Sequence, residues 1–194
     1  MQQTNSPTNR PVPTDVLDAV AERFIVRAIA YATGHSDPFS TSFWSSYSEY
    51  WPGVVKAWIT DIDPTRPNLG RIFELCEARE AQLDTQISAK PRPVLDHAID
   101  QIAKELAREE AWTALFRLAL YAQRTPAICL ALDCIEYADL DTLAECFSYV
   151  LQVPPGDIEI ALQRFDDSRP EGASSLREVA RPPSWIIQLR LSAS

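Results

Sequence analysis

The residues in this sequence whose spacing most resembles a metal or catalytic site are a histidine and the acidic residues near it. Asp96, His97 and Asp100 fall within about one turn of a predicted helix, and Glu109 and Glu110 follow along the chain. Carboxylates beside an imidazole can bind a metal ion or act as an acid–base pair. The solvent-exposed face of an ordinary acidic helix has the same pattern. We therefore interpret these residues as a solvated face and predict no metal site.

The second histidine and the cysteines give weaker signals. His35 stands in a Gly-His-Ser-Asp run, which suits a catalytic loop but is also ordinary where a helix ends, so we interpret it as a loop residue. The cysteines form no C-x-x-C pair and have no histidine near them in sequence, so neither a zinc site nor a thiol nucleophile is expected. Their apolar neighbours predict buried, reduced thiols at Cys76, Cys129, Cys134 and Cys146.

Glycine is scarce in this chain. It occurs five times in 194 residues, and no two glycines are close enough to form a loop that cradles phosphate. Nucleotide-binding α/β enzymes depend on such loops. We therefore predict no cofactor and no enzymatic activity. An enzyme with a carboxylate-rich pocket, with or without a divalent metal ion, is kept as the alternative.

Negative charge is the least ordinary property of the sequence. The net charge is −9, from 27 acidic and 18 basic residues, and no lysine or arginine occurs between Arg124 and Arg164. Nucleic acids and anionic membranes bind clustered basic residues, so neither is expected as a partner. An acidic surface instead speeds association with a basic protein. The candidate contact residues from this interval are Asp133, Glu136, Asp139, Asp141 and Glu145.

Part of this acidic interval also has a local structural role. Asp139 or Asp141 suits the N-cap of a helix that ends near Leu151. The remaining candidates have no such role in the sequence. We therefore expect them to form a contact surface rather than to stabilise a helix end.

A dense group of aromatic residues over 39–58 is the second candidate contact surface. Trp44 and Trp51 stand seven residues apart in it, although Pro52 interrupts any continuous helix. Tryptophan is a common anchor at protein interfaces, which makes both residues candidates for partner binding. The alternative is that these rings fill the core, and the sequence leaves both interpretations open.

Residues 93–123 are predicted to organise the fold. Their first half places Ile99, Ile102 and Leu106 on one buried helical stripe. Their second half is apolar nearly all round, and such a helix needs neighbours on most sides. The segment is either one long helix or two helices that meet near Arg108. We place it at the centre of an all-α domain.

Capping residues and apolar periodicity predict the other helices. The predicted ranges are 15–33, 69–88 with Asn68 as its cap, 126–137, 139 or 141 to 151, and 157–165. A short helix precedes Pro52, and residues 54–62 form either a second short helix or a strand. The middle of the 69–88 helix, residues 77–80, is expected to face solvent.

The domain organisation follows from these elements. Residues 1–13 are polar and proline-rich, which predicts a disordered tail, and residues 14–194 form a single helical domain of about seven helices, as a bundle or an irregular α-hairpin array. Residues 185–191 alternate in the manner of a strand that pairs with 54–62 or across a dimer, unless they form a short helix. No secretory signal or membrane-length apolar run is present, so a cytoplasmic location is expected.

These patterns together predict a protein-binding module that uses an acidic surface against a basic protein partner. Inhibitors, immunity-type proteins, adaptors and chaperones are the classes of protein with this character. The carboxylate-pocket enzyme is the main alternative, and a purely structural subunit is the other.

Overall fold

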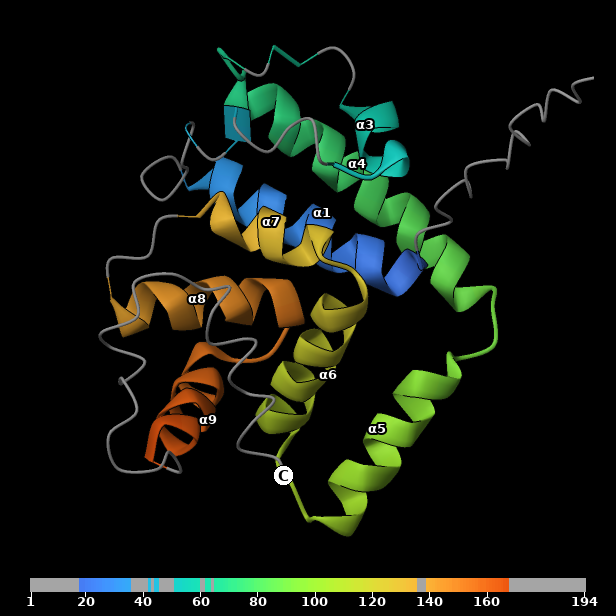
Figure 1. Cartoon of the computed structure of the whole chain (residues 1–194), viewed down its shortest axis with the longest axis vertical. Helices are drawn as coiled ribbons and strands as arrows, with labels where there is room; N and C mark the ends of the chain where they lie inside the picture. The colour runs from blue at the N-terminus through green and yellow to red at the C-terminus, as the bar shows by residue number, and fades with distance from the viewer. Residues whose placement is uncertain are drawn as a thin grey trace, which may run out of the picture.

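The computed structural model of the chain describes residues 18–35, 42, 44–45, 51–59, 62–63, 65–135 and 139–167, and of residues 165–167 it describes the backbone alone. The elements in this part of the chain are all α-helices (Figure 1). They are α1 (Ala19–Gly34), α3 (Gly53–Trp58), α4 (Leu69–Ser88), α5 (Val94–Glu105), α6 (Glu110–Arg124), α7 (Ala127–Asp133), α8 (Leu140–Leu151) and α9 (Pro155–Asp167). The predicted all-α fold is confirmed.

Helix α1 occupies the centre of the fold, with α4, α6, α7 and α8 packed around it (Figure 1). Its sequence, AVAERFIVRAIAYATG, places small and branched apolar residues on every side, and its buried positions run almost without a break from Val20 to Thr33. Asp18 starts the helix by accepting a hydrogen bond from the Val20 amide at 2.8 Å. The centre is therefore α1 rather than residues 93–123, because α1 is buried along almost its whole length and makes the most extensive contacts between helices.

Three ion pairs join α4 to the charged positions of α1, and the most exposed of them is Arg23 with Asp84. Arg79 Nε and Nη2 donate to the two carboxylate oxygens of Glu22 at 2.7 and 3.0 Å. Arg27 Nε donates to Glu80 Oε1 at 2.6 Å. Glu22 is only 2% exposed, so its carboxylate depends on Arg79 for compensation. The expectation that residues 77–80 face solvent is corrected for Arg79 and Glu80, which turn toward α1.

Residues 93–123 form two helices, the second of the two arrangements that the sequence allowed. Helix α5 ends in a left-handed residue, Ala107, with φ 48°. The Arg108 amide donates to the Ala103 carbonyl at 2.9 Å, and the Ala107 amide donates to the Lys104 carbonyl at 3.2 Å. These are the two hydrogen bonds of a Schellman motif, which ends a helix and redirects the chain. The turn places α5 beside α6.

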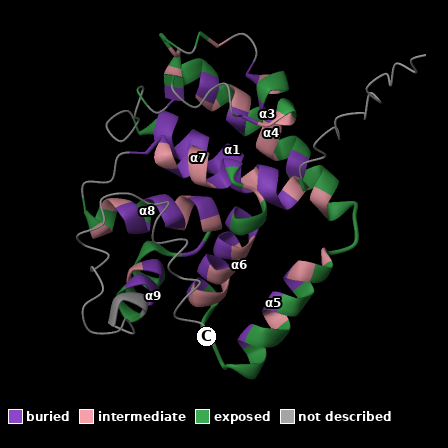
Figure 2. Ribbon diagram, in the orientation of Figure 1, coloured by how far each residue is buried: buried purple, intermediate pink, exposed green. Residues whose placement is uncertain are grey.

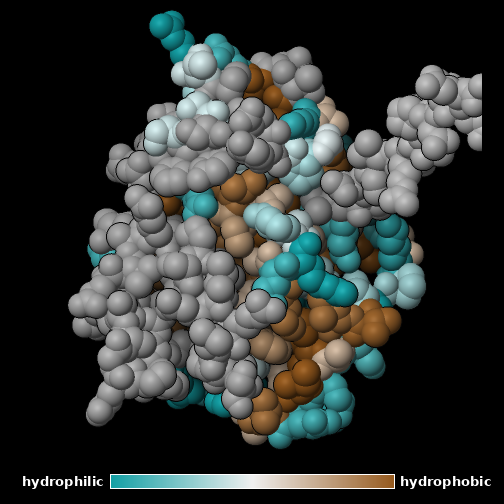
Figure 3. All heavy atoms as spheres, viewed as in Figure 1, coloured by the Kyte–Doolittle hydropathy of each residue, from teal (hydrophilic) through white to brown (hydrophobic). Residues whose placement is uncertain are grey.

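Helix α5 leaves apolar side chains in solvent. Val94 is 87% exposed, Leu106 54% and Ile102 40%. Exposed and half-buried residues dominate this helix in Figure 2, and apolar atoms gather over the α5–α6 side of the face seen in Figure 3. The predicted buried stripe is thus corrected at Ile102 and Leu106. The buried apolar positions are Ile99 and Ala103, because α5 packs chiefly on α6.

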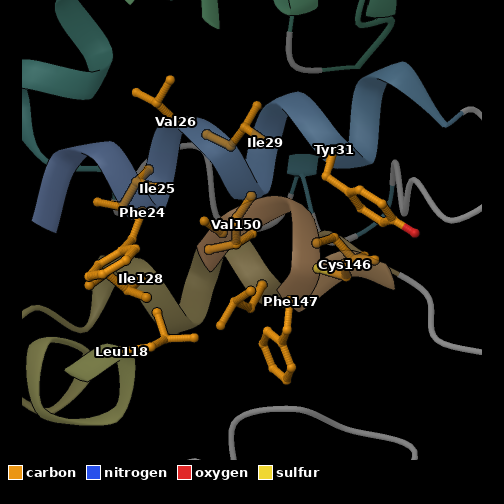
Figure 4. Packing of buried hydrophobic residues seen from close by; sticks show 14 of the residues in the cluster. Phe24, Ile25, Val26, Ile29, Tyr31, Leu118, Ile128, Cys146, Phe147 and Val150 are labelled. Atoms are coloured by element: carbon orange, nitrogen blue, oxygen red, sulfur yellow. The ribbon is translucent and has the colours of Figure 1, made fainter. Parts of the chain in front are cut away.

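One hydrophobic cluster draws residues from every other described helix. In the close view of Figure 4, Phe24 of α1 points toward the side of Ile128 of α7 and Leu118 of α6, and Val150 of α8 lies on the lower side of α1. Phe24 also contacts the Tyr121 ring edge-on, with centroids 5.7 Å apart. These contacts hold α1, α6, α7 and α8 as one packed unit.

The two candidate tryptophan anchors lie in this core. Trp44 is 1% exposed and Trp51 is 2% exposed, with ring centroids 5.8 Å apart. Their indoles pack on each other and on neighbours such as Val55 of α3, so in this structure they offer no surface to a partner. The core interpretation therefore replaces the surface one. The 53–58 part of the neighbouring segment is helical, which removes the strand alternative there.

Several predictions fall outside the described residues. These are the disordered tail over 1–13, the strand pattern over 185–191 and the contact residue Glu136. Helix α4 has the predicted bounds and the predicted cap, Asn68, whose side chain accepts from the Arg71 amide at 3.1 Å. Within the described part of the chain, none of the helices has the length and apolar character needed to cross a bilayer.

Candidate functional site

Helix α8 presents the exposed carboxylates of the acidic interval. Asp141 and Glu145 are exposed, and with Gln152 they share one outer face of the helix. The opposite face buries Leu143, Phe147 and Val150, as the sequence predicted. Burial of the apolar face therefore fixes the direction of the acidic one.

The other acidic candidates have different surroundings. Asp133, at the end of α7, is half-buried and interacts with neighbouring groups, so it is a weaker contact candidate than the α8 residues. Asp139 is exposed and is the N-cap of α8: its Oδ1 accepts from the Thr142 amide at 2.8 Å and from the Thr142 hydroxyl at 2.8 Å. This confirms one of the two caps that the sequence allowed.

The outer face of α8 keeps its negative charge. Among the described residues, the ion pairs do not involve Asp139, Asp141 or Glu145. Arg164 of α9, which ends the lysine- and arginine-free interval, pairs with Glu109 instead. Within the described part of the chain, the charge of these three carboxylates is therefore not neutralised by an ion pair.

Replacing Asp139 with alanine should lower the melting temperature (Tm) most at neutral pH. Hydrogen bonds from the Thr142 amide and then its hydroxyl hold the pKa of Asp139 below its usual value. A carboxyl group with a lower pKa in the folded state stabilises the fold above its unfolded pKa, and this contribution is lost as the pH falls through its folded pKa. Circular dichroism melts of the parent and Asp139→Ala should therefore converge in acid. Asp141→Ala is the control; an Asp139→Ala deficit that is independent of pH would contradict the cap.

A hollow of about 640 Å³ lies beside the acidic face, between the C-terminal end of α1 and the turn from α8 to α9. Two parts of the chain that are far apart in sequence form it. The described residues that line it are Tyr31, His35, Glu145, Ser148, Tyr149, Gln152, Val153, Pro154 and Pro155. Glu145 therefore belongs both to the acidic face and to the hollow.

Three aromatic rings form one side of the hollow. His35 stacks on Tyr31 with centroids 4.4 Å apart, and the Tyr149 ring is tilted against Tyr31 at 5.8 Å. His35 Nδ1 lies 3.0 Å from the Tyr31 carbonyl oxygen. A carbonyl oxygen only accepts, so a hydrogen bond at this contact has Nδ1 as its donor. The expected loop position of His35 is therefore also a stacking position.

Tyr31 is the buried member of this group. It is 3% exposed and reaches from α1 past Cys146 of α8 (Figure 4). Burial, followed by the nearby Cys146 and Glu145, raises the pKa of Tyr31 to about 12. Its phenol is therefore neutral at physiological pH, and Glu145 is the acidic charge at this edge of the hollow.

The acidic residues around His97 are engaged by α6. Arg117 Nε lies 3.1 Å from Asp96 Oδ1, and Arg117 Nη2 lies 2.7 Å from Asp100 Oδ1. Asp96 is 6% exposed, so the predicted solvated face is corrected there, while His97 is exposed. Burial, and then the charge of Asp96, raises the pKa of Tyr121 beside this group. Carboxylates compensated by an arginine are poorly suited to bind a metal ion.

The thiols and the metal-ligand types do not form a reactive centre in the described part of the chain. No group of three or more His, Cys, Asp or Glu residues there is placed to hold a metal ion. Burial raises the pKa of Cys134 to about 12 and also raises the pKa of Cys76 and of Cys129. A thiol with a raised pKa is a poor nucleophile at neutral pH.

Comparisons with known proteins give no family for this chain. A scan against protein-family models, a search of curated proteins and a search of solved structures each found no match. The function is therefore argued from the fold, the charge and the hollow.

Sequence reasoning missed the hollow and its aromatic side. His35 was noted only as a loop residue, and Tyr31 and Tyr149 were not singled out. Tyr31 reads as one more apolar position of α1 and Tyr149 as one more of α8. The packing of these helices on each other brings the two rings together, and no local pattern contains that information.

Proposed function

We propose that this chain is a protein-binding module whose contact surface is the outer face of α8, around Asp139, Asp141 and Glu145, and that its partner is a basic protein. The observation that carries the proposal is a set of exposed carboxylates without ion-pair partners among the described residues, in an interval that contains no lysine or arginine. Opposite charge steers such a surface toward a basic partner and raises the association rate.

The placement of the charges supports a contact role over a purely structural one. Asp139 serves as a helix cap, and Asp141 lies in the first turn of α8, where a negative charge favours the helix dipole. Glu145 lies mid-helix, where neither explanation applies. It also borders the hollow, which gives the surface a concave feature as well as charge.

The proposal includes the classes of module that act by binding alone: inhibitor, immunity-type protein, adaptor or chaperone. Such a protein needs no cofactor. The described cysteines are all free, and free cysteines are typical of reducing compartments, so we place the protein in the cytoplasm. The exposed charge disfavours nucleic acid as the partner.

Charge reversal on α8 tests the proposal. The intact chain, the Asp141→Lys/Glu145→Lys variant and a matched control, Glu77→Lys/Glu105→Lys, serve as baits in the cell of origin, and captured proteins are identified by mass spectrometry. Glu77 on α4 and Glu105 on α5 are exposed, so the control makes the same change in net charge on other faces. We expect basic proteins that the parent and the control capture and that the α8 variant loses.

The folded state of each bait must be the same for this comparison. Reversal at Asp141 costs on the order of 0.5 kcal/mol through the helix dipole, which corresponds to a Tm shift of roughly 1–2 °C. If the α8 variant and the control lose the same captured proteins, net charge rather than this face governs binding, and the proposed surface is wrong.

A further inference from the structure

We propose that the hollow bordered by Tyr149, His35 and Glu145 is a binding pocket for one arginine side chain of the basic partner. This inference rests on the proposed function and adds to it a defined site and a defined ligand group. Three properties of the described lining carry it: aromatic surface, oxygen acceptors, and the absence of lysine or arginine among the described residues that line it.

The aromatic surface is held in place before any ligand arrives. The Tyr31–His35 stack has an interplanar angle of 25°, and Tyr31 is fixed in the core. Tyr149, which is half-buried, packs against Tyr31 and lines the hollow. A guanidinium group stacks on aromatic faces and is weakly hydrated, so it gains from such a surface with little loss of solvation.

The polar groups of the hollow suit a donor-only ligand. Glu145 contributes a carboxylate without an ion pair among the described residues, and Ser148 a hydroxyl. The Gln152 amide nitrogen donates to the Tyr149 carbonyl at 2.6 Å, which leaves its side-chain oxygen as an acceptor. Arginine has five N–H donors and no acceptor, so it matches this set.

The backbone around Gln152 fixes the end of α8, from which the Ser148 and Gln152 side chains extend. Gln152 has φ 58° and ψ 44°, the left-handed conformation that ends α8. Its amide donates to the Ser148 carbonyl, and the Val153 amide donates to the same oxygen at 3.3 Å. Backbone amides therefore satisfy the Ser148 carbonyl at the end of α8, so the side-chain oxygens of Glu145, Ser148 and Gln152 are not needed to cap the helix.

The test uses short peptides with a single basic residue. A five-residue glycine peptide with a central arginine and blocked ends is compared with the same peptide containing citrulline, which keeps the shape and removes the charge. Binding to the full-length protein is followed by amide chemical shifts in two-dimensional NMR at low salt. The variants are Tyr149→Leu, which removes the ring, Tyr149→Phe, which keeps it, and Glu145→Gln.

We expect the arginine peptide to shift amides around His35 and over 145–153, and the citrulline peptide to bind at least about fivefold more weakly. Tyr149→Leu and Glu145→Gln should each weaken the arginine peptide by about three- to tenfold, the range of one cation–π contact or one charged contact. Tyr149→Phe should bind like the parent. Amide spectra of each variant without peptide show whether the variant is folded. Tyr149→Phe keeps the ring and changes the packing least, so a difference in binding between Tyr149→Leu and Tyr149→Phe reports on the ring itself.

The outcomes separate this inference from the proposed function. Equal binding of the arginine and citrulline peptides, or an arginine peptide that binds Tyr149→Leu as well as the parent, would overturn the pocket. If the α8 charge reversal then still abolishes capture of basic proteins, the acidic surface stands without the pocket. If the arginine peptide binds as expected but the α8 variant and the control capture the same proteins, the arginine pocket is supported and the proposed α8 contact surface is wrong.

Discussion

Replacing Ile29 with alanine should lower the free energy of unfolding by about 2–5 kcal/mol, because the side chain is completely buried where α1 packs on its neighbours. The loss combines the transfer of the removed methyl and methylene groups with the cavity that remains. Ile29 belongs to the shared hydrophobic cluster and lies on the same side of α1 as Val26 (Figure 4), so its removal leaves a cavity inside the packed core. Urea unfolding followed by circular dichroism measures the change.

Ile102→Ala is the matched control for this result. It makes the same substitution on α5, where the side chain is 40% exposed, and should cost less than about 1 kcal/mol. Because both variants replace isoleucine with alanine, a difference in their stability reports on the burial of α1 compared with α5. Equal destabilisation at Ile29 and Ile102 would show that α1 is not the centre of the fold.

Replacing Arg79 with methionine should cost about 3–5 kcal/mol, although Arg79 lies on the outer helix α4. The substitution leaves the carboxylate of Glu22, which is 2% exposed, without its bidentate partner. An uncompensated buried charge is far more costly than the ion pair is stabilising. The free energy of unfolding from denaturant titration gives the magnitude.

Two further variants show whether the pair is the cause. Arg71→Met, on the same helix, breaks an exposed pair with Glu74 and should cost no more than about 0.5 kcal/mol. Glu22→Leu combined with Arg79→Met removes both charges and should recover most of the stability that Arg79→Met loses. A double variant as unstable as the sum of its two single variants would mean that Glu22 and Arg79 do not depend on each other.

Helix ends with a local cause were predictable from the sequence. Asn68 and Asp139 each accept a hydrogen bond from the first turn of their own helix. A few adjacent residues therefore determine where α4 and α8 begin. The end of α5 was less predictable, since its left-handed residue is Ala107 and not a glycine. The sequence could therefore not decide between one helix and two.

The arrangement of the helices depended on pairs that are distant in sequence. The charges of Glu22 and Arg27 suggest an exposed side of α1 until Arg79 and Glu80 are brought against them. The hollow has the same origin, because its lining comes from the end of α1 and the end of α8. The acidic face of α8 was predictable, since the opposite, apolar face can be read within a single helix.

The most direct test of the contact surface is to map where a basic peptide binds. Amide chemical shifts of the labelled full-length chain are recorded during titration with a peptide of alternating arginine and glycine, at low and at moderate salt. We expect the largest shifts on residues 139–153 and 31–35, and we expect them to become smaller as salt is added, because the contact is between exposed charges. Shifts centred instead on α4 or α5, where exposed acids such as Glu77 and Glu105 also lie, would contradict it.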